Sequence, residues 1–330
     1  MAKSSSVSLS VIVVSWNTVD LLRACLRSLY DDREAVCWQV IVVDNGSEDG
    51  SAAMVRREFP QVELIENEVN AGFVGGSNRG LQVAGGKFLL LLNPDTVVEP
   101  GALPALVRFM AGEPQAGAAG PMLLNRDSTL QLSCGRPPTF WSECTNKLLL
   151  HKLLPFFKLG RWKHDEVREV GWVTGAALLV RREVLEEVGP LDERLFMFYE
   201  DLDWCMRIRA AGWKIFYLPH SRIRHLGGQS TRQDLARMLV ISQQSLFYLY
   251  GKHFHRRLAQ PLRLLTAYEM VARAAAWSVH YLARRHRRSA SGPRLRAYVQ
   301  ILTRCLSDRS YWSPAAPTDP AGAEQRGVKA

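Results

Sequence analysis

Short runs of apolar residues alternate with helical patterns over the first 121 residues of the chain. The apolar runs have the length and the β-branched or leucine-rich composition of strands. They lie at residues 9–14, 39–43, 62–66 and 88–92. The stretches between them carry apolar residues at helical spacing, and they predict helices at 20–30, at 51–58 and from about 75–78. Because the strands lack apolar–polar alternation, helices should cover both faces of the sheet. The rhythm predicts an α/β fold with a mostly parallel sheet flanked by helices.

The second part of the chain has a looser pattern. Its predicted elements are strands at 172–180 and 214–218 and helices at 183–188, 204–211 and 235–250. Beyond residue 252 the chain is rich in arginine and predicts a C-terminal helical extension. We expect one domain over 1–250 with halves 1–121 and 122–250, a basic extension over 251–310 and a disordered tail over 311–330.

Positive charge is concentrated near the C-terminal end. The chain has a formal net charge of +10. Residues 251–330 hold 15 Lys or Arg and 4 Asp or Glu, whereas the first 250 residues hold 27 and 28. An anionic partner would therefore dock on the last quarter of the chain. Nucleic-acid binding is one interpretation, but the body of the chain is neutral and few aromatic residues lie among the arginines.

The expected location is cytoplasmic. No stretch approaches the roughly 18 uncharged apolar residues of a membrane-spanning helix. The N-terminus passes directly into the first strand, without the pattern of a signal peptide. The cysteines are scattered with no CxxC pair, so reduced and mostly buried thiols are expected. They are Cys25, Cys37, Cys134, Cys144, Cys205 and Cys305.

Polar residues gather where the predicted strands end. Parallel sheets bind their ligands beyond the carboxyl ends of their strands. The clusters are Ser15-Trp16-Asn17, Asp44-Asn45-Gly46-Ser47, Asn70-Ala71-Gly72 and Asn93-Pro94-Asp95. Four strand ends that point the same way indicate a binding site at one edge of the sheet.

Asn93-Pro94-Asp95 follows a dry strand and has two interpretations. A carboxylate at this position can hold a divalent ion that bridges a diphosphate, and the proline makes the turn rigid. The alternative is an ordinary Asn-Pro-Asp turn.

The acidic run Glu200-Asp201-Leu202-Asp203 also has two interpretations. Asp201 or Asp203 could cap the helix that follows. However, crowded carboxylates repel one another, and a carboxyl in an apolar setting gains a raised pKa that suits a general base.

A histidine and a glycine-rich segment complete the candidate chemistry. His225 is followed by Gly227 and Gly228, which let the backbone approach a phosphate closely. A lone histidine is more often structural than a ligand. Residues 72–80 are glycine-rich and open a helix, whose N-terminus would attract phosphate or sugar hydroxyls. This segment is neither GxGxxG nor a P-loop, which weakens the dehydrogenase and P-loop interpretations.

These residues together resemble the inverting glycosyltransferases of family 2, which have the Rossmann-like GT-A fold, and within them the bacterial rhamnosyltransferase branch. The resemblance covers roughly residues 8–230. It rests on the order and spacing of Val-Ser-Trp-Asn at 14–17, Val-Asp-Asn-Gly-Ser at 43–47, Asn-Ala-Gly-Phe at 70–73, Asn-Pro-Asp at 93–95, Thr-Gly-Ala at 174–176 and Phe-Tyr-Glu-Asp-Leu-Asp-Trp at 198–204.

The resemblance implies roles for individual residues. Asp201 matches the family's base, which deprotonates the acceptor hydroxyl, and Glu200 and Asp203 support it. Asp95 and His225 match the ligands of a divalent metal, Mg²⁺ or Mn²⁺. The expected donor-binding residues are Ser15, Trp16, Asn17, Asp44, Asn45, Gly72, Phe73, Gly76, Ser77, Asn78, Asn93 and Asp95. The expected acceptor-binding residues are Thr174, Gly175, Ala176, Glu200 and Trp204. Asn93 and Ser77 depart from the commonest family pattern, which has an acid and an asparagine there.

The implied function is inverting transfer of L-rhamnose from dTDP-L-rhamnose to a lipid-linked or glycan acceptor in cell-envelope polysaccharide synthesis. The alternative within the same fold is another donor, such as UDP-galactofuranose, UDP-GlcNAc or UDP-glucose. Residues 148–163 and the arginine-rich helices could lie on the anionic inner leaflet of the cell membrane, which would make the protein peripheral there. Alternatively, these helices pack on the domain or form a homodimer.

Overall fold

The computed structural model describes residues 8–31, 38–148, 162–227, 234–283 and 288–307. The chain divides into two compact units. The sheet unit comprises Met1–Pro137, Gly160–Asp192 and Glu200–Ser230, and the helical unit comprises Pro138–Leu159, Glu193–Tyr199 and Thr231–Ala330. The expected boundary at residue 250 differs from this division, because the helix that begins at Leu235 groups with the helices that follow it.

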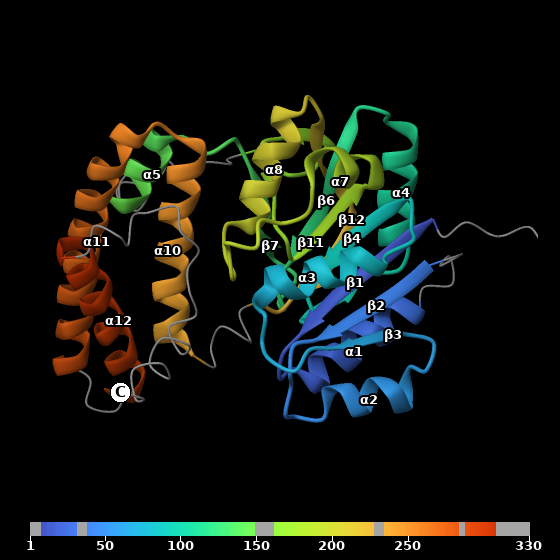
Figure 1. Ribbon diagram of the computed structural model, residues 1–330, viewed down its shortest axis with the longest axis horizontal. Helices are drawn as coiled ribbons and strands as arrows, with labels where there is room; N and C mark the ends of the chain where they lie inside the picture. The colour runs from blue at the N-terminus through green and yellow to red at the C-terminus, as the bar shows by residue number, and fades with distance from the viewer. Residues whose placement is uncertain (1–7, 32–37, 149–161, 228–233, 284–287, 308–330) are drawn as a thin grey trace, which may run out of the picture. The chain divides into compact units, whose positions relative to one another are not determined.

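The sheet unit alternates strands and helices along the chain (Figure 1). Its elements are β1 (Leu9–Ser15), α1 (Val19–Tyr30), β2 (Trp38–Asp44), α2 (Ser51–Glu58), β3 (Glu63–Glu66), α3 (Gly72–Val83), β4 (Phe88–Leu92), β5 (Thr96–Val98), α4 (Ala102–Gly112), β6 (Ala116–Leu124), β7 (Leu130–Gln131), β8 (Cys134–Gly135), β9 (Arg168–Val170), β10 (Trp172–Val173), β11 (Ala177–Arg181), α7 (Arg182–Val188), α8 (Glu200–Ala210) and β12 (Lys214–His225).

The central sheet has the strand order β3-β2-β1-β4-β11-β6-β12-β5. The first four strands in this order are parallel, as the sequence predicts. Beyond them β11 runs antiparallel to both β4 and β6, and β12 runs parallel to β6. The strands β7 and β9 extend the sheet along β6 and β12, and β8 pairs with β10 separately. The α/β fold is confirmed, with four consecutive parallel strands in the N-terminal half and a mixed arrangement beyond them.

Side chains of the inner strands pack on both faces of the sheet. In β1, Val11 and Val13 belong to the core shared with α1, α2 and α4. Val14, one position on, faces α3, because a Cβ on Gly76 would lie 2.6 Å from its Cγ1 atom. All five residues of β4 are buried. This two-sided burial is the reason for the unalternating strands in the sequence.

Three elements differ from their predicted form. The strand expected at 172–180 is divided into β10 and β11 by residues 174–176. The acidic run is the first turn of α8 rather than a turn before it. The strand β12 continues past the expected end at residue 218 to His225, because its later residues pair with β5 and with the end of β6. Each difference arises from a partner strand or loop that is distant in the sequence.

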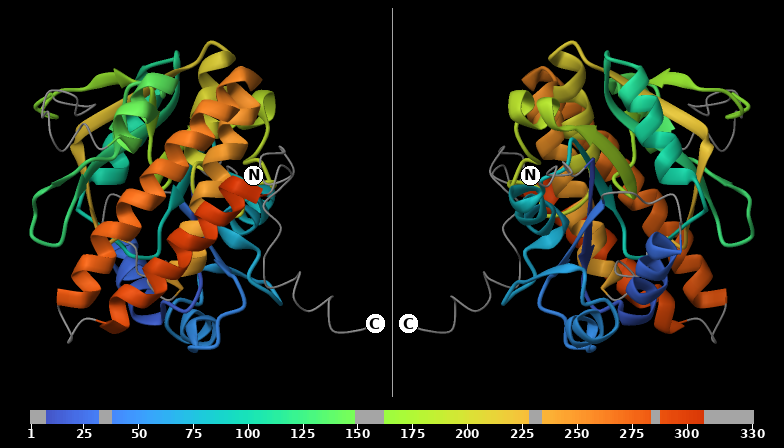
Figure 2. Two further views of the ribbon diagram at one scale, coloured as in Figure 1. Left: turned by 90° about the vertical axis from the view of Figure 1, so that its left-hand side faces the viewer. Right: turned by 90° about the vertical axis from the view of Figure 1, so that its right-hand side faces the viewer.

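The helical unit is built from α5 (Phe140–Lys147), α10 (Leu235–His253), the 3-10 helix η2 (Arg256–Leu258), α11 (Ala259–Ala283) and α12 (Arg288–Ser307). Figure 2 shows α11 and α12 (orange and red) side by side. Their core includes Met270 of α11 and Tyr298 of α12 together with Val240 of α10. Lys147 of α5 is buried and forms an ion pair with Glu269 of α11 at 3.0 Å.

Three other predictions concern membrane-spanning helices, the cysteines and the segments at 148–163 and 311–330. Among the described residues, no helix is both long enough and apolar enough to span a membrane. The five described cysteines are free and buried, as predicted, and Cys37 lies outside the described residues. Most of the apolar-cationic stretch at 148–163 and the tail at 311–330 also lie outside them.

Candidate active site

The parallel strands bring three of the predicted polar clusters to one edge of the sheet. In the register of β1, Ser15 stands opposite Asp44 of β2, and Val13 stands opposite Leu92 of β4. The residues that follow these strands therefore emerge at the same level. Trp16 is half-buried at this edge, directly after Ser15.

The end of β2 offers an unused carboxylate oxygen. Asp44 is 3% exposed, and its Oδ2 atom accepts a hydrogen bond from the backbone N–H of Ser47 at 2.9 Å. Its Oδ1 atom is buried and has no hydrogen-bond partner in the described part of the chain. Buried carboxylate oxygens are normally satisfied, so this atom is poised for a donor group of a ligand. An N–H of a nucleobase is such a donor.

Asn17 connects the two strand ends around Asp44. Its backbone N–H donates to Ser47 Oγ at 2.9 Å, and its Oδ1 atom accepts from the N–H of Glu48 at 2.8 Å. Its φ of 50° is in the left-handed region, which Asn adopts more readily than most residues. The structure therefore uses the backbone and side chain of Asn17 to shape the loop around Asp44.

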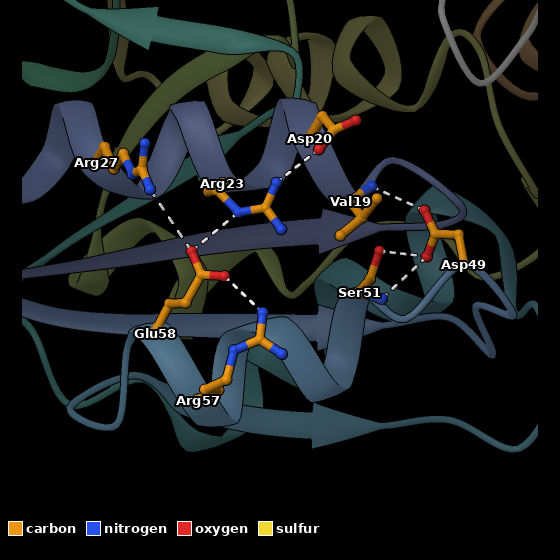
Figure 3. A network of polar contacts seen from close by, with 8 residues as sticks. All are labelled: Val19, Asp20, Arg23, Arg27, Asp49, Ser51, Arg57 and Glu58. Atoms are coloured by element: carbon orange, nitrogen blue, oxygen red, sulfur yellow. Dashed lines mark hydrogen bonds and ion pairs between the residues drawn. The ribbon is translucent and has the colours of Figure 1, made fainter.

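One carboxylate holds the helices that follow both loops (Figure 3). Asp49 Oδ2 accepts from the backbone N–H of Val19, the first residue of α1, at 2.8 Å. Its Oδ1 atom accepts from the N–H and the hydroxyl of Ser51, the first residue of α2, at 3.0 and 2.6 Å. Farther along the two helices, Arg23 of α1 bonds to Glu58 of α2 at 2.9 Å. This network fixes the entry of both helices beside the Asp44 loop.

The start of α3 packs tightly against the same edge. Asn45 donates from Nδ2 to the carbonyl of Gly72 at 2.8 Å and accepts from Asn67 Nδ2 at 2.6 Å. A Cβ on Gly76 would collide with Val14, so glycine is required for this close approach. Asn45 and Gly76 were expected to bind the donor, and in this structure both hold α3 against the strand ends.

Two further residues of α3 have different environments. The hydroxyl of Ser77 is buried and has no hydrogen-bond partner among the described residues, so it is available to a ligand. The amide of Asn78 instead pairs with the backbone of Leu191, donating at 2.9 Å and accepting at 3.1 Å. Both polar atoms of the Asn78 amide thus hold the segment before α8, and the expected contact of Asn78 with the donor stays a prediction.

The turn after β4 meets the end of β12. Asp95 Oδ1 lies 3.2 Å from His225 Nε2, and Asn93 Nδ2 lies 3.3 Å from the same nitrogen. Asp95 is 6% exposed, and its carbonyl accepts from the backbone N–H of Leu226. The pairing of β5 with β12 brings these residues together across 130 positions of sequence. The predicted proximity of Asp95 and His225 is thus observed.

Gln131 orients the histidine and was not found from the sequence. Its Oε1 atom lies 2.7 Å from His225 Nδ1, while its Nε2 atom donates to Asn125 Oδ1 at 3.1 Å. Because the amide oxygen can only accept, Nδ1 is the nitrogen that donates to it, and Nε2, which lies on the side of Asp95, is the nitrogen that could bind a metal. The glutamine belongs to the short strand β7, whose pairing with β6 had no clear sequence pattern.

Asp95 and His225 fit a divalent ion that also takes ligands from a substrate. In an octahedral shell with bonds of about 2.1 Å, neighbouring ligand atoms lie about 3 Å apart, close to the separation of Oδ1 and Nε2 here. Mg²⁺ and similar ions are often held by one or two protein groups plus phosphate oxygens and water. The described residues contain no group of three or more His, Cys, Asp or Glu side chains arranged around a metal. A site of this kind would therefore need the diphosphate of its substrate.

The loop between β10 and β11 joins this pair to the acidic helix. The carbonyl of Ala176 accepts from the backbone N–H of Asn93 at 3.0 Å. The N–H of the neighbouring Gly175 donates to Asp201 Oδ2 at 2.8 Å. A Cβ on Gly175 would lie 3.6 Å from the ring of Phe73. The loop thus brings α3, the Asn93–Asp95 turn and α8 to one place.

Asp201 has the environment of a base. Burial raises its pKa, against the opposing effect of hydrogen bonds from the N–H groups of Gly175 and Leu202 and from the side chain of Thr174. Its neighbour Glu200 is affected in the same direction: burial and the charge of Asp201 raise its pKa to about 8. Both carboxyls of this pair therefore hold a proton more readily than carboxyls in water, which suits a general base.

The backbone before α8 is strained. Phe198 and Tyr199 both have φ near +65°, which is unfavourable for aromatic residues. Such strain is commonly found where a fold positions functional groups. Here it sets the direction in which Glu200 and Asp201 enter α8.

Two predicted site residues of α8 are structural instead. Asp203 is fully buried and bonds to Arg207 Nε at 2.9 Å. Arg207 also donates to the carbonyls of Val188 and Pro190. Trp204 is fully buried and donates from its indole N–H to the carbonyl of Gly189 at 2.9 Å. The burial and the partners of Asp203 and Trp204 favour a structural role for both, and their expected roles beside the base and at the acceptor stay predictions.

The sequence model of the family described as "Glycosyltransferase like family 2" matches residues 7–240 of this chain. That range contains every predicted site residue.

Two relatives are rhamnosyltransferases. The chain is 30% identical over 266 residues to the N-acetylglucosaminyl-diphospho-decaprenol L-rhamnosyltransferase of Mycobacterium tuberculosis, covering 74% of this chain and 85% of the relative. It is 25% identical over 260 residues to the rhamnosyltransferase WbbL of Escherichia coli, covering 73% and 92%.

Among solved structures, the mannosyltransferase PcManGT from Pyrobaculum calidifontis in complex with GDP-Man and Mn²⁺ superimposes with a TM-score of 0.55. The match has 17% sequence identity and covers 91% of this chain and 87% of that one. At this identity the likeness concerns the fold, which is that of GT-A glycosyltransferases.

Proposed function

We propose a specific reaction for this chain, which belongs to glycosyltransferase like family 2: inverting transfer of L-rhamnose from dTDP-L-rhamnose to a lipid-linked glycan acceptor. The rhamnosyl donor is suggested by the two relatives, whose names describe rhamnosyl transfer. The lipid-linked acceptor is suggested by the decaprenol-diphosphate substrate in the name of the first. Such an acceptor would place the reaction at the inner face of the cell membrane, in cell-envelope polysaccharide synthesis.

The observation that carries the proposal is the connection between Asp201 and the Asp95–His225 pair. Two consecutive residues, Gly175 and Ala176, bond to Asp201 and to Asn93 respectively. The proposed base and the turn that carries the proposed diphosphate-binding group are thus bonded to neighbouring residues of one short loop. Transfer of a sugar from a nucleotide requires this combination, since a hydroxyl must lose a proton while a diphosphate leaves.

Each polar group then has one task. Asp44 Oδ1 accepts from an N–H of the nucleobase, and the hydroxyl of Ser77 contacts the donor. Asp95 and His225 would hold Mg²⁺ or Mn²⁺, which when bound neutralises charge on the leaving diphosphate. Residues 174–176 border the acceptor.

Asp201 performs the proton transfer. Its carboxylate takes the proton of the acceptor hydroxyl as that oxygen attacks the anomeric carbon. The bond from this carbon to the diphosphate oxygen breaks, and the nucleoside diphosphate leaves with the electron pair. Attack on the side opposite the leaving group inverts the configuration at the anomeric carbon. Glu200, neutral at pH 7, would orient the acceptor or the base.

A donor panel tests the substrate assignment. With Mn²⁺ present, dTDP-L-rhamnose should give the highest rate of donor hydrolysis and the largest rise in melting temperature among dTDP-rhamnose, UDP-galactofuranose, UDP-GlcNAc and UDP-glucose. A higher rate with one of the UDP-sugars would replace rhamnose as the donor while leaving the site assignment intact.

Substitution of the base tests the mechanism. Asp201→Asn keeps an oxygen for the N–H of Gly175 but cannot take a proton, so transfer should fall by a factor on the order of 10² to 10⁴. Donor affinity, measured by calorimetry, should be almost unchanged. Transfer at the wild-type rate would show that another group is the base.

A further inference from the structure

The helices α11 and α12 of the helical unit form an antiparallel pair. Arg263 near the start of α11 donates to the carbonyl of Cys305 near the end of α12. Met270 packs in one cluster with Tyr298, and the guanidinium of Arg294 lies 4.6 Å from the ring of Trp277. From one contact to the next, the residue numbers rise along α11 and fall along α12. The helices are therefore antiparallel, and the three contacts fix their register.

The outward side of α11 is apolar. Leu264, Tyr268 and Val271 are 68%, 53% and 52% exposed. Their spacing of four and three residues places them on one line along the helix. The exposed Ala275 continues the line by four further positions. A helix that faces water normally shows charged residues here, and α11 shows none along this line.

The charged residues of α11 between positions 259 and 278 have inward partners instead. Arg263 bonds to the backbone of α12, and Glu269 pairs with the buried Lys147. Arg273 bonds to Glu269 at 2.8 Å. The charged residues in this part of α11 are therefore paired within the helical unit, and its outward line consists of uncharged side chains.

The outward side of α12 continues the same surface. Val299 and Leu306 are 56% and 68% exposed and stand seven residues apart. On both helices the exposed line is rotated by about a third of a turn, in the same sense, from the residues that touch the other helix. Two antiparallel helices with this property present their exposed lines on one common side. We call this surface, made of Leu264, Tyr268, Val271, Val299 and Leu306, the α11–α12 face.

The charge around the α11–α12 face is of one sign. Residues 251–307 contain 12 Lys or Arg and a single acid, Glu269. The side chain of that acid is 9% exposed and occupied by Lys147 and Arg273. Arg257 and Arg296 are exposed and stand seven positions before Leu264 and three positions before Val299 in the sequence. Apolar side chains surrounded by cations without an exposed acid are suited to a lipid surface of negative charge.

We propose that the α11–α12 face docks on an anionic membrane surface, with its apolar side chains among the lipid acyl chains and its arginines at the headgroups. A second copy of the chain is the less suitable occupant, because its identical face would bring the same cations together. A helix of 25 residues, about 37 Å long, would lie along the surface rather than cross it. The inference extends the proposed function, since a lipid-linked acceptor resides in a membrane.

Vesicle flotation of the full chain tests the proposal without donor or acceptor. The protein should float with vesicles of phosphatidylglycerol and phosphatidylcholine, and its partition coefficient on phosphatidylcholine alone should be lower on the order of tenfold. The variant Leu264→Ser, Tyr268→Ser, Val271→Ser should lose binding to the mixed vesicles by a similar factor or more. The matched control Val83→Ser, Val167→Ser changes exposed apolar residues of the sheet unit and should bind like the wild type.

A second variant guards against misfolding of the first. Val299→Ser, Leu306→Ser alters only α12 and should also weaken vesicle binding, with circular dichroism and melting temperature unchanged. Wild-type binding by both folded variants would overturn the proposal, and so would equal binding to neutral vesicles. A wild-type dimer that the variants convert to monomers would assign the face to a second copy instead. Donor hydrolysis should be retained in both variants, so a failure of membrane docking is distinguishable from a failure of the proposed reaction.

Discussion

Single residues of this chain have roles that depend on their neighbours more than on their type. Four carboxylates, those of Asp44, Asp95, Asp201 and Asp203, lie in or beside the candidate site. Asp203 is neutralised by Arg207, whereas Asp44 keeps an unpartnered oxygen. Asp95 lies against His225, and Asp201 accepts only uncharged donors. The contacts of each carboxylate therefore decide which of the proposed roles it suits: structural, ligand-binding, metal-binding or basic.

Gln131 should control the metal affinity of the site through His225. Gln131→Leu removes the acceptor for Nδ1–H, so Mn²⁺ should bind about 10- to 100-fold more weakly in the presence of dTDP. Gln131→Glu keeps an acceptor and should bind nearly as well as the wild type. Calorimetry or electron paramagnetic resonance of Mn²⁺ provides the measurement, with Gln115→Leu on the surface as control. Unchanged affinity in the Leu variant would show that Gln131 does not position the histidine.

Glu200 should make the protein less stable as the pH rises. Its pKa is about 8 in the folded protein, against 4.5 as the ordinary value. Between these values the unfolded chain releases a proton that the folded chain retains, so stability is lost as the pH rises from about 4.5 toward 8. The variant Glu200→Gln has no proton to release at this position, so it should not lose stability in this way. The melting temperature of the variant relative to the wild type should therefore increase over this interval and then level off, and a constant difference would contradict the shift.

At the scale of elements, helix starts and strand ends make the site. The helices α1, α2, α3 and α8 each begin next to a predicted cluster, where their N-terminal N–H groups favour negative charge. Glycine allows α3 to approach β1, and the division of one expected strand at residues 174–176 allows Gly175 to reach Asp201. These elements were predicted correctly in kind, but the sequence pattern did not reveal what their ends would touch.

Asp49 should stabilise two helices at once. Asp49→Ala leaves the first N–H groups of α1 and α2 without their shared acceptor, and we expect a loss of about 1–2 kcal/mol in the free energy of unfolding. Urea denaturation measures this quantity. Asp20→Ala is the matched control in α1, because Asp20 is largely exposed and only pairs with Arg23 within the helix. Equal losses in the two variants would mean that the double cap contributes nothing beyond a surface ion pair.

At the scale of the whole molecule, the site combines residues from nearly the full length of the sheet unit. Asp44, Asp95, Gly175, Asp201 and His225 come from five separate elements or their ends. Their convergence results from the insertion of β11 between β4 and β6 and from the return of β12 to β5. A ligand that contacts several of them should therefore stabilise the unit as a whole.

The substitution Asp95→Ala should abolish the effect of the metal on nucleotide binding. In the wild type, Mn²⁺ should increase the affinity for dTDP and raise the melting temperature obtained with dTDP alone. In Asp95→Ala the part of both effects that depends on Mn²⁺ should disappear. Glu186→Ala, an exposed carboxylate on α7, serves as control. Persistence of Mn²⁺-dependent affinity in the Asp95 variant would remove Asp95 from the metal site.

The sequence by itself determined the strands and helices of the parallel half, the family and most of the residues at the strand ends. These follow from local periodicity and from short motifs with fixed order, which are properties of neighbouring positions. Only the tertiary structure revealed the buried contacts of Asp203, Trp204 and Asn78, the hydrogen bond between Gln131 and His225, and the partners of the charged residues of α11 within the helical unit. Those results depend on burial and on partners far away in the chain, and no local pattern contains them.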